Sequence, residues 1–113
     1  MRVKDVEKVW GAESWIVNDA YCCKLLLLKR GMQCSLHYHP IKDETFLVVE
    51  GSVRMEVDGA VRTLGVGDSV RISPGLRHRF AGLEDSVIVE TSTHHDDADV
   101  VRLSESGPYG GEW

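Results

Sequence analysis

The chain has 113 residues, of which 42% are hydrophobic and 27% charged, and its 13 basic and 18 acidic side chains give a formal net charge of −5. This length suits a single domain with a modest core, and the composition excludes a disordered chain. The negative charge, without any basic cluster, argues against nucleic acid or an anionic membrane surface as a partner.

We expect no targeting signal in the first residues. Residues 1–8 contain no apolar core, and the longest strongly apolar run, residues 25–28, is far shorter than a membrane span. We therefore expect a cytoplasmic protein. Cys22, Cys23 and Cys34 lack C-x-x-C spacing, so they are expected to be reduced packing residues.

Glycines separate short apolar runs along the chain, and no run has a 3.6-residue period, which is typical of an all-β protein. Eight to nine strands are expected, with a helical turn only in the first dozen residues or near Asp96. The predicted strands span residues 20–30, 33–39, 45–50, 52–57, 60–64, 69–73, 77–80 and 86–92. Strands of this spacing favour a sandwich or barrel over a parallel α/β fold.

The strand at residues 52–57 and the turn after it are the clearest local signals. Val53 and Met55 alternate with charged residues, which predicts a strand with one buried face. Asp58 and Gly59 then predict a tight hairpin, because glycine accepts the positive φ of a primed turn.

Three histidines and one glutamate form a candidate metal site. His37 and His39 are two apart on a predicted strand, so both side chains leave the same face and can bind one ion. A turn at residues 40–43 leads to Glu44, and a barrel would bring His78 to the other three from a later strand. Three imidazoles and a carboxylate leave open positions, as in catalytic rather than structural sites. We predict one divalent transition metal there, with Mn, Fe, Co, Ni, Cu and Zn all compatible.

The spacing of these residues resembles the first cupin motif. Five residues lie between Gly31 and His37, four between His39 and Glu44, and six between Glu44 and Gly51. This matches the motif without a gap. The resemblance implies a double-stranded β-helix, also called a jelly-roll barrel.

A second cupin motif is present in a looser form. Four of its residues are Gly67, Pro74, Gly75 and His78. Pro74 and Gly75 are adjacent where the family usually separates them, and Gly82 stands where an asparagine is common. We expect one cupin domain over residues 1–113, with a barrel core at about 20–92 and terminal segments packed on it.

Most of the chain also resembles the cupin part of type II mannose-6-phosphate isomerases. The residues that carry this resemblance are Trp10-Gly11, Lys29-Arg30-Gly31, Ser35-Leu36, Glu44, residues 48–51, Val89-Glu90, residues 96–102 and Tyr109-Gly110. In that family the barrel usually follows a nucleotidyltransferase domain. The present chain has no Gly-rich segment that would cradle a phosphate, so only sugar or sugar-phosphate handling is implied.

Several positions depart from that family. His37 replaces a common glutamine, Lys42 an arginine, and Thr45 and Phe46 a histidine and a tryptophan. The metal site is therefore more complete and the substrate site altered. Lys42 is a candidate for contact with a substrate phosphate, although a lysine lacks the two-pronged geometry of arginine. The alternative is a solvated turn residue.

Candidate residues for substrate chemistry lie near the end of the last long strand. Glu90 is the candidate catalytic base, and His94 and His95 follow in a polar turn as either bases or surface residues. Arg102 either binds substrate or pairs with the acidic residues before it.

Three functions remain open. The first is aldose–ketose isomerisation of a small sugar, with the metal as Lewis acid and Glu90 moving the proton. The second is an iron-dependent dioxygenase that acts on a small organic acid. The third is a barrel that binds a small ligand without catalysis, because cupin folds host many chemistries.

A homodimer is also expected. Arg54, Arg62 and Arg71 lie on outward strand faces, and the apolar run at residues 25–28 would form an exposed strand. Such a strand in a monomer invites edge pairing, so a partner copy would cover one sheet.

Overall fold

A computed structural model describes residues 3–113, which form thirteen β-strand segments and no helix. None of the described residues therefore belongs to a helix that could cross a membrane. The segments are β1 (Lys4–Lys8), β2 (Gly11–Asn18), β3 (Tyr21–Leu28), β4 (Met32–Gln33), β5 (His37–Tyr38), β6 (Glu44–Glu50), β7 (Val53–Val57), β8 (Ala60–Leu64), β9 (Ser69–Ile72), β10 (His78–Gly82), β11 (Ser86–Thr93), β12 (Val101–Arg102) and β13 (Gly107–Pro108).

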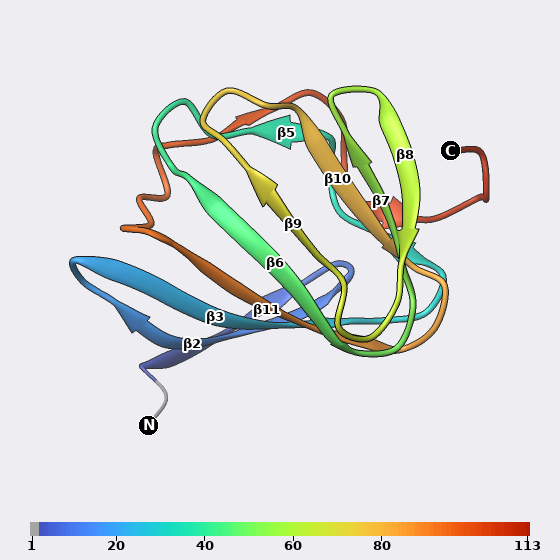
Figure 1. Ribbon diagram of the computed structural model, residues 1–113, viewed down its shortest axis with the longest axis horizontal. Helices are drawn as coiled ribbons and strands as arrows, with labels where there is room; N and C mark the ends of the chain where they lie inside the picture. Colours follow the sequence, from blue (N-terminus) through green and yellow to red (C-terminus); the bar gives the residue numbers. More distant parts are fainter. Residues whose placement is uncertain (1–2) are drawn as a thin grey trace.

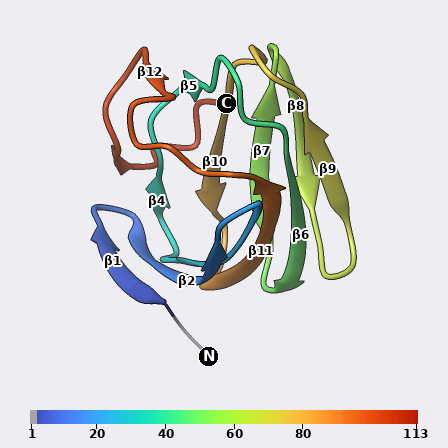
Figure 2. The ribbon, with the colours of Figure 1, turned by 90° about the vertical axis from the view of Figure 1, so that its left-hand side faces the viewer.

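The strands form two facing sheets (Figures 1 and 2). The first has the order β1-β2-β3-β11-β6-β9, and the second has the order β12-β5-β10-β4-β13, with β7 and β8 continuing from β10. All pairings between these strands are antiparallel. The predicted all-β fold, a double-stranded β-helix, is confirmed.

The core lies between the sheets. Leu26, Val48 and Ile88 come from the first sheet, and Met55 and Phe80 come from the second. Because side chains alternate along a strand, each strand contributes every second residue to this core. Beside the histidines, polar side chains such as Lys42 and Glu90 also line the cavity between the sheets.

The predicted hairpin at Asp58 and Gly59 is confirmed. Val57 pairs with Ala60, and the two turn residues have φ angles of 51° and 84°. Both values are positive, as a primed two-residue turn requires. The turn fixes the register that buries Val53 and Met55.

The expected helical turns are wrong. Residues 4–18 form the β1–β2 hairpin, in which Lys8 pairs with Gly11. Near Asp96 the chain makes a turn, closed by a hydrogen bond from the Asp99 amide to the Asp96 carbonyl, rather than a helix.

The single strand predicted over residues 33–39 is two short ones, β4 and β5. Between them, the amides of Ser35 and Leu36 donate to the hydroxyls of Ser106 and Ser104 instead of to a neighbouring strand. The C-terminal segment therefore supplies hydrogen bonds that an uninterrupted sheet would have made.

The Leu-rich run lies on β3, which is not at an edge. β3 is paired on both sides, with β2 and β11, and it buries Leu26 and Leu28 in the core. Edge pairing of this strand, expected above, is therefore wrong. Leu25 and Leu27 point to the outer face, where Leu27 is 42% exposed.

Candidate metal centre

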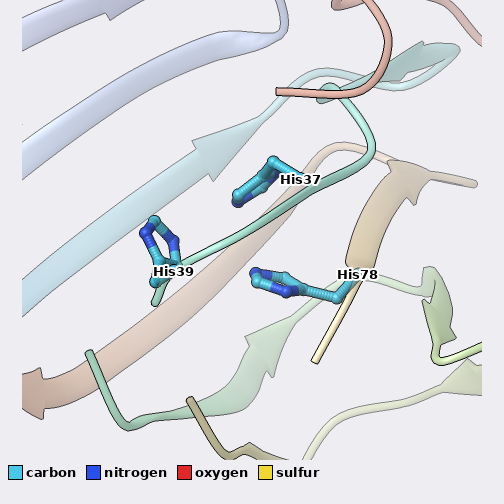
Figure 3. Close-up of side chains that lie close together, drawn as sticks. All are labelled: His37, His39 and His78. Atoms are coloured by element: carbon cyan, nitrogen blue, oxygen red, sulfur yellow. The ribbon is translucent and has the colours of Figure 1, made fainter. Parts of the chain in front are cut away.

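Three separate strands bring the predicted ligand residues together. His37 lies on β5 and His39 just beyond it, while His78 begins β10 and is the direct cross-strand partner of His37. Ligand atoms of the three rings all lie within 4.8 Å of one another. Figure 3 shows the three rings turned toward a common point.

Glu44 joins this group from the start of β6. Its Oε2 atom lies 3.3 Å from His39 Nε2 and 3.2 Å from His78 Nε2. The side chains of Glu44, His39 and His78 are buried and that of His37 is partly buried. The structure thus clusters the three predicted histidines and places Glu44 against two of them, His39 and His78.

Backbone carbonyls determine the tautomer of each ring. The Nδ1 atoms of His37, His39 and His78 lie 2.6, 2.7 and 2.9 Å from the carbonyl oxygens of Ser35, Asp99 and Leu76. A carbonyl only accepts hydrogen bonds, so each Nδ1 carries the proton and donates it. Each Nε2 therefore keeps a free lone pair, the form that binds a metal.

Two of the inward atoms have no hydrogen-bond partner. Among buried side-chain atoms of residues 3–113, these are Glu44 Oε2 and His78 Nε2. Buried polar atoms without partners are costly, and two facing lone pairs repel each other. A divalent cation between them removes both problems, so the residues fit a metal.

The protonation states also suit a metal. Burial and the neighbouring His78 lower the pKa of His37 to about 3, and burial lowers the pKa of His39 to about 4. Burial raises the pKa of Glu44, but its charged surroundings, the Lys42 ammonium among them, outweigh this effect and hold that pKa at about 2. These ligands are deprotonated at neutral pH, as metal binding requires.

A cavity of about 350 Å³ adjoins the histidines. Its lining includes His37, His39, Glu44, Lys42, Glu90 and Arg102. Three of the four candidate metal ligands and all three candidates for substrate chemistry thus line one cavity, whereas His78 is fully buried.

Lys42 is buried, with only 3% of its surface exposed, so its interpretation as a solvated turn residue is wrong. Its Nζ lies 3.2 Å from Glu90 Oε2, 3.1 Å from His95 Nδ1 and 3.6 Å from Glu44 Oε1. Burial lowers the pKa of Lys42, but Glu90 and Glu44 outweigh this effect and raise it. The ammonium stays charged and donates to Glu90 and His95, with Glu44 at ion-pair distance.

Glu90 is buried in the middle of the first sheet, on β11. Burial and the Glu44 carboxylate raise the pKa of Glu90, against the lowering effect of Lys42. The hydroxyl of Ser92 donates to the same oxygen that Lys42 contacts. A buried carboxylate with a raised pKa beside a polar cavity is a candidate proton-transfer group.

The two histidines after β11 differ in position. His94 is exposed, and its ring contacts the carbonyl of Asp19, away from the cavity lining. His95 lines the cavity, and its Nε2 lies 2.8 Å from Asp97 Oδ1 while Nδ1 faces Lys42. Burial and the two nearby lysines, Lys24 and Lys42, lower the pKa of His95. The ring is therefore neutral, so it accepts a hydrogen bond from Lys42 and donates one to Asp97.

Arg102 lies on β12, next to His37 in the strand ladder. Its side chain is exposed and lines the cavity, as a residue that contacts substrate at the mouth would.

Sequence analysis missed an ion pair in the cavity wall. Lys24 is almost fully buried, and its Nζ lies 3.3 Å from Glu13 Oε1 and 4.1 Å from the ring centre of Trp15. The alternation of residues along β3 indicates the burial of Lys24, because Lys24 shares the inward face of β3 with Cys22 and Leu26. A lysine at such a position needs a buried partner.

Comparisons with known proteins agree with this fold. The family model described as Cupin domain matches residues 24–93. Mannose-1-phosphate guanylyltransferase of Escherichia coli (strain K12) is 27% identical over 107 residues, which cover 90% of this chain and 22% of that protein. D-lyxose/D-mannose isomerase of Thermosediminibacter oceani is 30% identical over 111 residues, which cover 74% of this chain and 61% of the isomerase. The chain thus spans less than two thirds of either relative.

Solved structures are similar as well. KdgF from Halomonas sp. has a TM-score of 0.72 at 22% identity, covering 77% of this chain and 81% of that chain. Oxalate decarboxylase from Bacillus subtilis has a TM-score of 0.76 at 18% identity, and the match covers 88% of this chain and 30% of that chain. These similarities establish the fold.

Proposed function

The chain belongs to the cupin family, and from this premise we propose that its barrel holds one divalent transition metal and isomerises a small sugar or sugar phosphate. The observation that carries the proposal is the cluster of three histidine rings, two of which, His39 and His78, also place Nε2 within 3.3 Å of the unpartnered Oε2 of Glu44. His37, His39, Glu44 and His78 would hold the metal. When bound, it supplies Lewis-acid polarisation of adjacent hydroxyl and carbonyl oxygens.

Two observations support a sugar as the ligand. A relative that is 30% identical carries the name D-lyxose/D-mannose isomerase, and the guanylyltransferases bear the name of a sugar phosphate. The cavity of about 350 Å³ lies near the small end of the range for small-molecule sites, roughly 300–1,000 Å³. Its charged lining suits a compact ligand with many hydroxyl groups.

Glu90 is the proposed base. Aldose–ketose isomerisation moves a proton between adjacent carbons, and a buried carboxylate with a raised pKa suits both its removal and its return. Lys42 donates to Glu90 and His95 and lies at ion-pair distance from Glu44, so we assign it to orienting Glu90 rather than to direct contact with substrate. Arg102 at the mouth is then the residue that meets a phosphate.

Turnover of mannose and mannose 6-phosphate to the matching ketoses, with and without added divalent metal, tests this function. Glu90→Gln is expected to lower kcat by at least about 100-fold, because it removes the base and keeps the shape. The metal content should equal that of the wild type. Saturable binding of both sugars to metal-loaded wild type without any product would reject isomerisation.

We also propose a homodimer, formed through the outer face of the first sheet. On this face Val89 pairs with Leu25 on one side and Leu47 on the other, and Leu27 and Val87 extend the apolar patch. Six strands of up to eight residues cover roughly 25 by 25 Å, about 600 Å² per copy. A standard interface buries about 800 Å² per partner, so this face approaches the required size.

Leu27→Glu is expected to convert the dimer to a monomer, because a charge would be buried at the centre of the interface. Val66→Glu is the control, since Val66 is exposed but lies in the turn between β8 and β9. Light scattering measures the mass of both variants. A wild-type protein that stays monomeric at high concentration would contradict the proposal.

A further inference from the structure

The loop of residues 94–100, between β11 and β12, contacts the candidate metal centre at one residue. The carbonyl oxygen of Asp99 lies 2.7 Å from Nδ1 of His39 and accepts a hydrogen bond from it. The carboxylate of Asp99 accepts hydrogen bonds from two consecutive amides, Ile41 at 2.9 Å and Lys42 at 2.8 Å. Sequence analysis treated this residue only as part of an acidic stretch.

His39 differs from the other two histidines in what orients it. His37 and His78 donate to carbonyls two residues away, at Ser35 and Leu76, so each ring is oriented by the backbone just before it. His39 donates to a carbonyl sixty residues away in sequence. Its orientation therefore depends on where the 94–100 loop lies.

The Asp99 carboxylate connects this loop to the turn that follows His39. Hydrogen bonds to a charged acceptor are stronger than neutral ones, and two from adjacent amides also determine orientation. The loop is itself held by a bond from the Asp99 amide to the Asp96 carbonyl and by paired bonds between Asn18 and His95. The position of the Asp99 carbonyl is therefore well defined.

We propose that Asp99 is a positioning residue of the metal centre. Its carbonyl fixes the ring of His39 with Nε2 turned inward. Its carboxylate places the backbone of Lys42, whose ammonium lies between Glu44 and Glu90. This role rests on the proposed metal binding, and it links the metal ligands to the proposed base through one side chain.

The test compares Asp99→Ala with Asp85→Ala. Asp85 is a matched control, because its carboxylate also accepts a backbone amide from a distant segment, that of Arg30 at 2.9 Å. Affinity for Zn²⁺ and Mn²⁺, measured by competition with a chelator, should fall about 10- to 100-fold in Asp99→Ala. Asp85→Ala should bind as the wild type does. The metal affinity of Asp99→Asn, which retains one carbonyl oxygen as acceptor, should lie between those of Asp99→Ala and Asp85→Ala.

A second measurement needs no metal. Long-range ¹H–¹⁵N spectra of the metal-free protein should show His39 as a single tautomer with the proton on Nδ1, and Asp99→Ala or Asp99→Asn should show a mixture. Circular dichroism checks that each variant is folded, and Asp99→Asn serves if Asp99→Ala is not. Wild-type affinity together with an unchanged His39 tautomer would overturn the proposal. A wild type that binds no metal would instead reject the proposed function, and the spectra would still test Asp99.

Discussion

His78→Ala is expected to lower the affinity for divalent metal by well over 100-fold. This exceeds the loss of about 10- to 100-fold that removal of a group that only orients a ligand causes. His78 is fully buried, and its Nε2 faces Glu44 with no other hydrogen-bond partner. Removing the ring takes away one of four donors, and no other side chain on β10 replaces it. Chelator competition and elemental analysis after dialysis both measure the effect.

His94→Ala is the matched control for this experiment. His94 is exposed and does not line the cavity, and its ring contacts the carbonyl of Asp19. It should retain wild-type affinity. Equal metal binding by His78→Ala and wild type would show that the ion is held elsewhere.

The metal-free protein is expected to lose stability steeply as the pH falls from 6.5 toward 4. The pKa values of His37 and His39 fall from 6.5 in the unfolded chain to about 3 and about 4 in the folded protein. Below pH 6.5 the unfolded state therefore binds protons that the folded state does not, and unfolding is favoured. Each fully shifted group contributes about 1.4 kcal/mol per pH unit, so with allowance for solvent screening the slope is about 2 kcal/mol per unit.

Urea denaturation of chelator-treated protein between pH 7 and pH 4.5 measures this slope. His37→Gln should roughly halve it, because one of the two shifted groups is gone. Glu44 adds to the loss only below its unfolded value of 4.5, since its folded pKa is about 2. A free energy of unfolding that stays constant between pH 6.5 and pH 4.5 would show that His37 and His39 are not held neutral by burial.

The elements with a clear local pattern were predictable from sequence. Val53 and Met55 alternate with charged residues, and Asp58 and Gly59 give a turn with only one common geometry. His37 and His39 are two residues apart, so the period of a strand predicts that their side chains share one face. His78 could be added only through the resemblance to a known motif.

Other features depend on contacts between distant parts of the chain. The β1–β2 hairpin was missed because its alternating charged residues give no apolar stripe. The burial of Lys42 depends on Glu90 and His95, about fifty residues away, and the role of Asp99 depends on His39. No local pattern carries such pairings, because they arise only when the barrel closes.

Anomalous diffraction from crystals of the metal-loaded protein, collected at the absorption edge of the metal, tests the central claim most directly. Four ligands at one ion predict a single strong peak, about 2.0–2.2 Å from Nε2 of His37, His39 and His78 and from a carboxylate oxygen of Glu44. The absence of a peak at this position in crystals that contain the metal, or a peak on the surface alone, would contradict it.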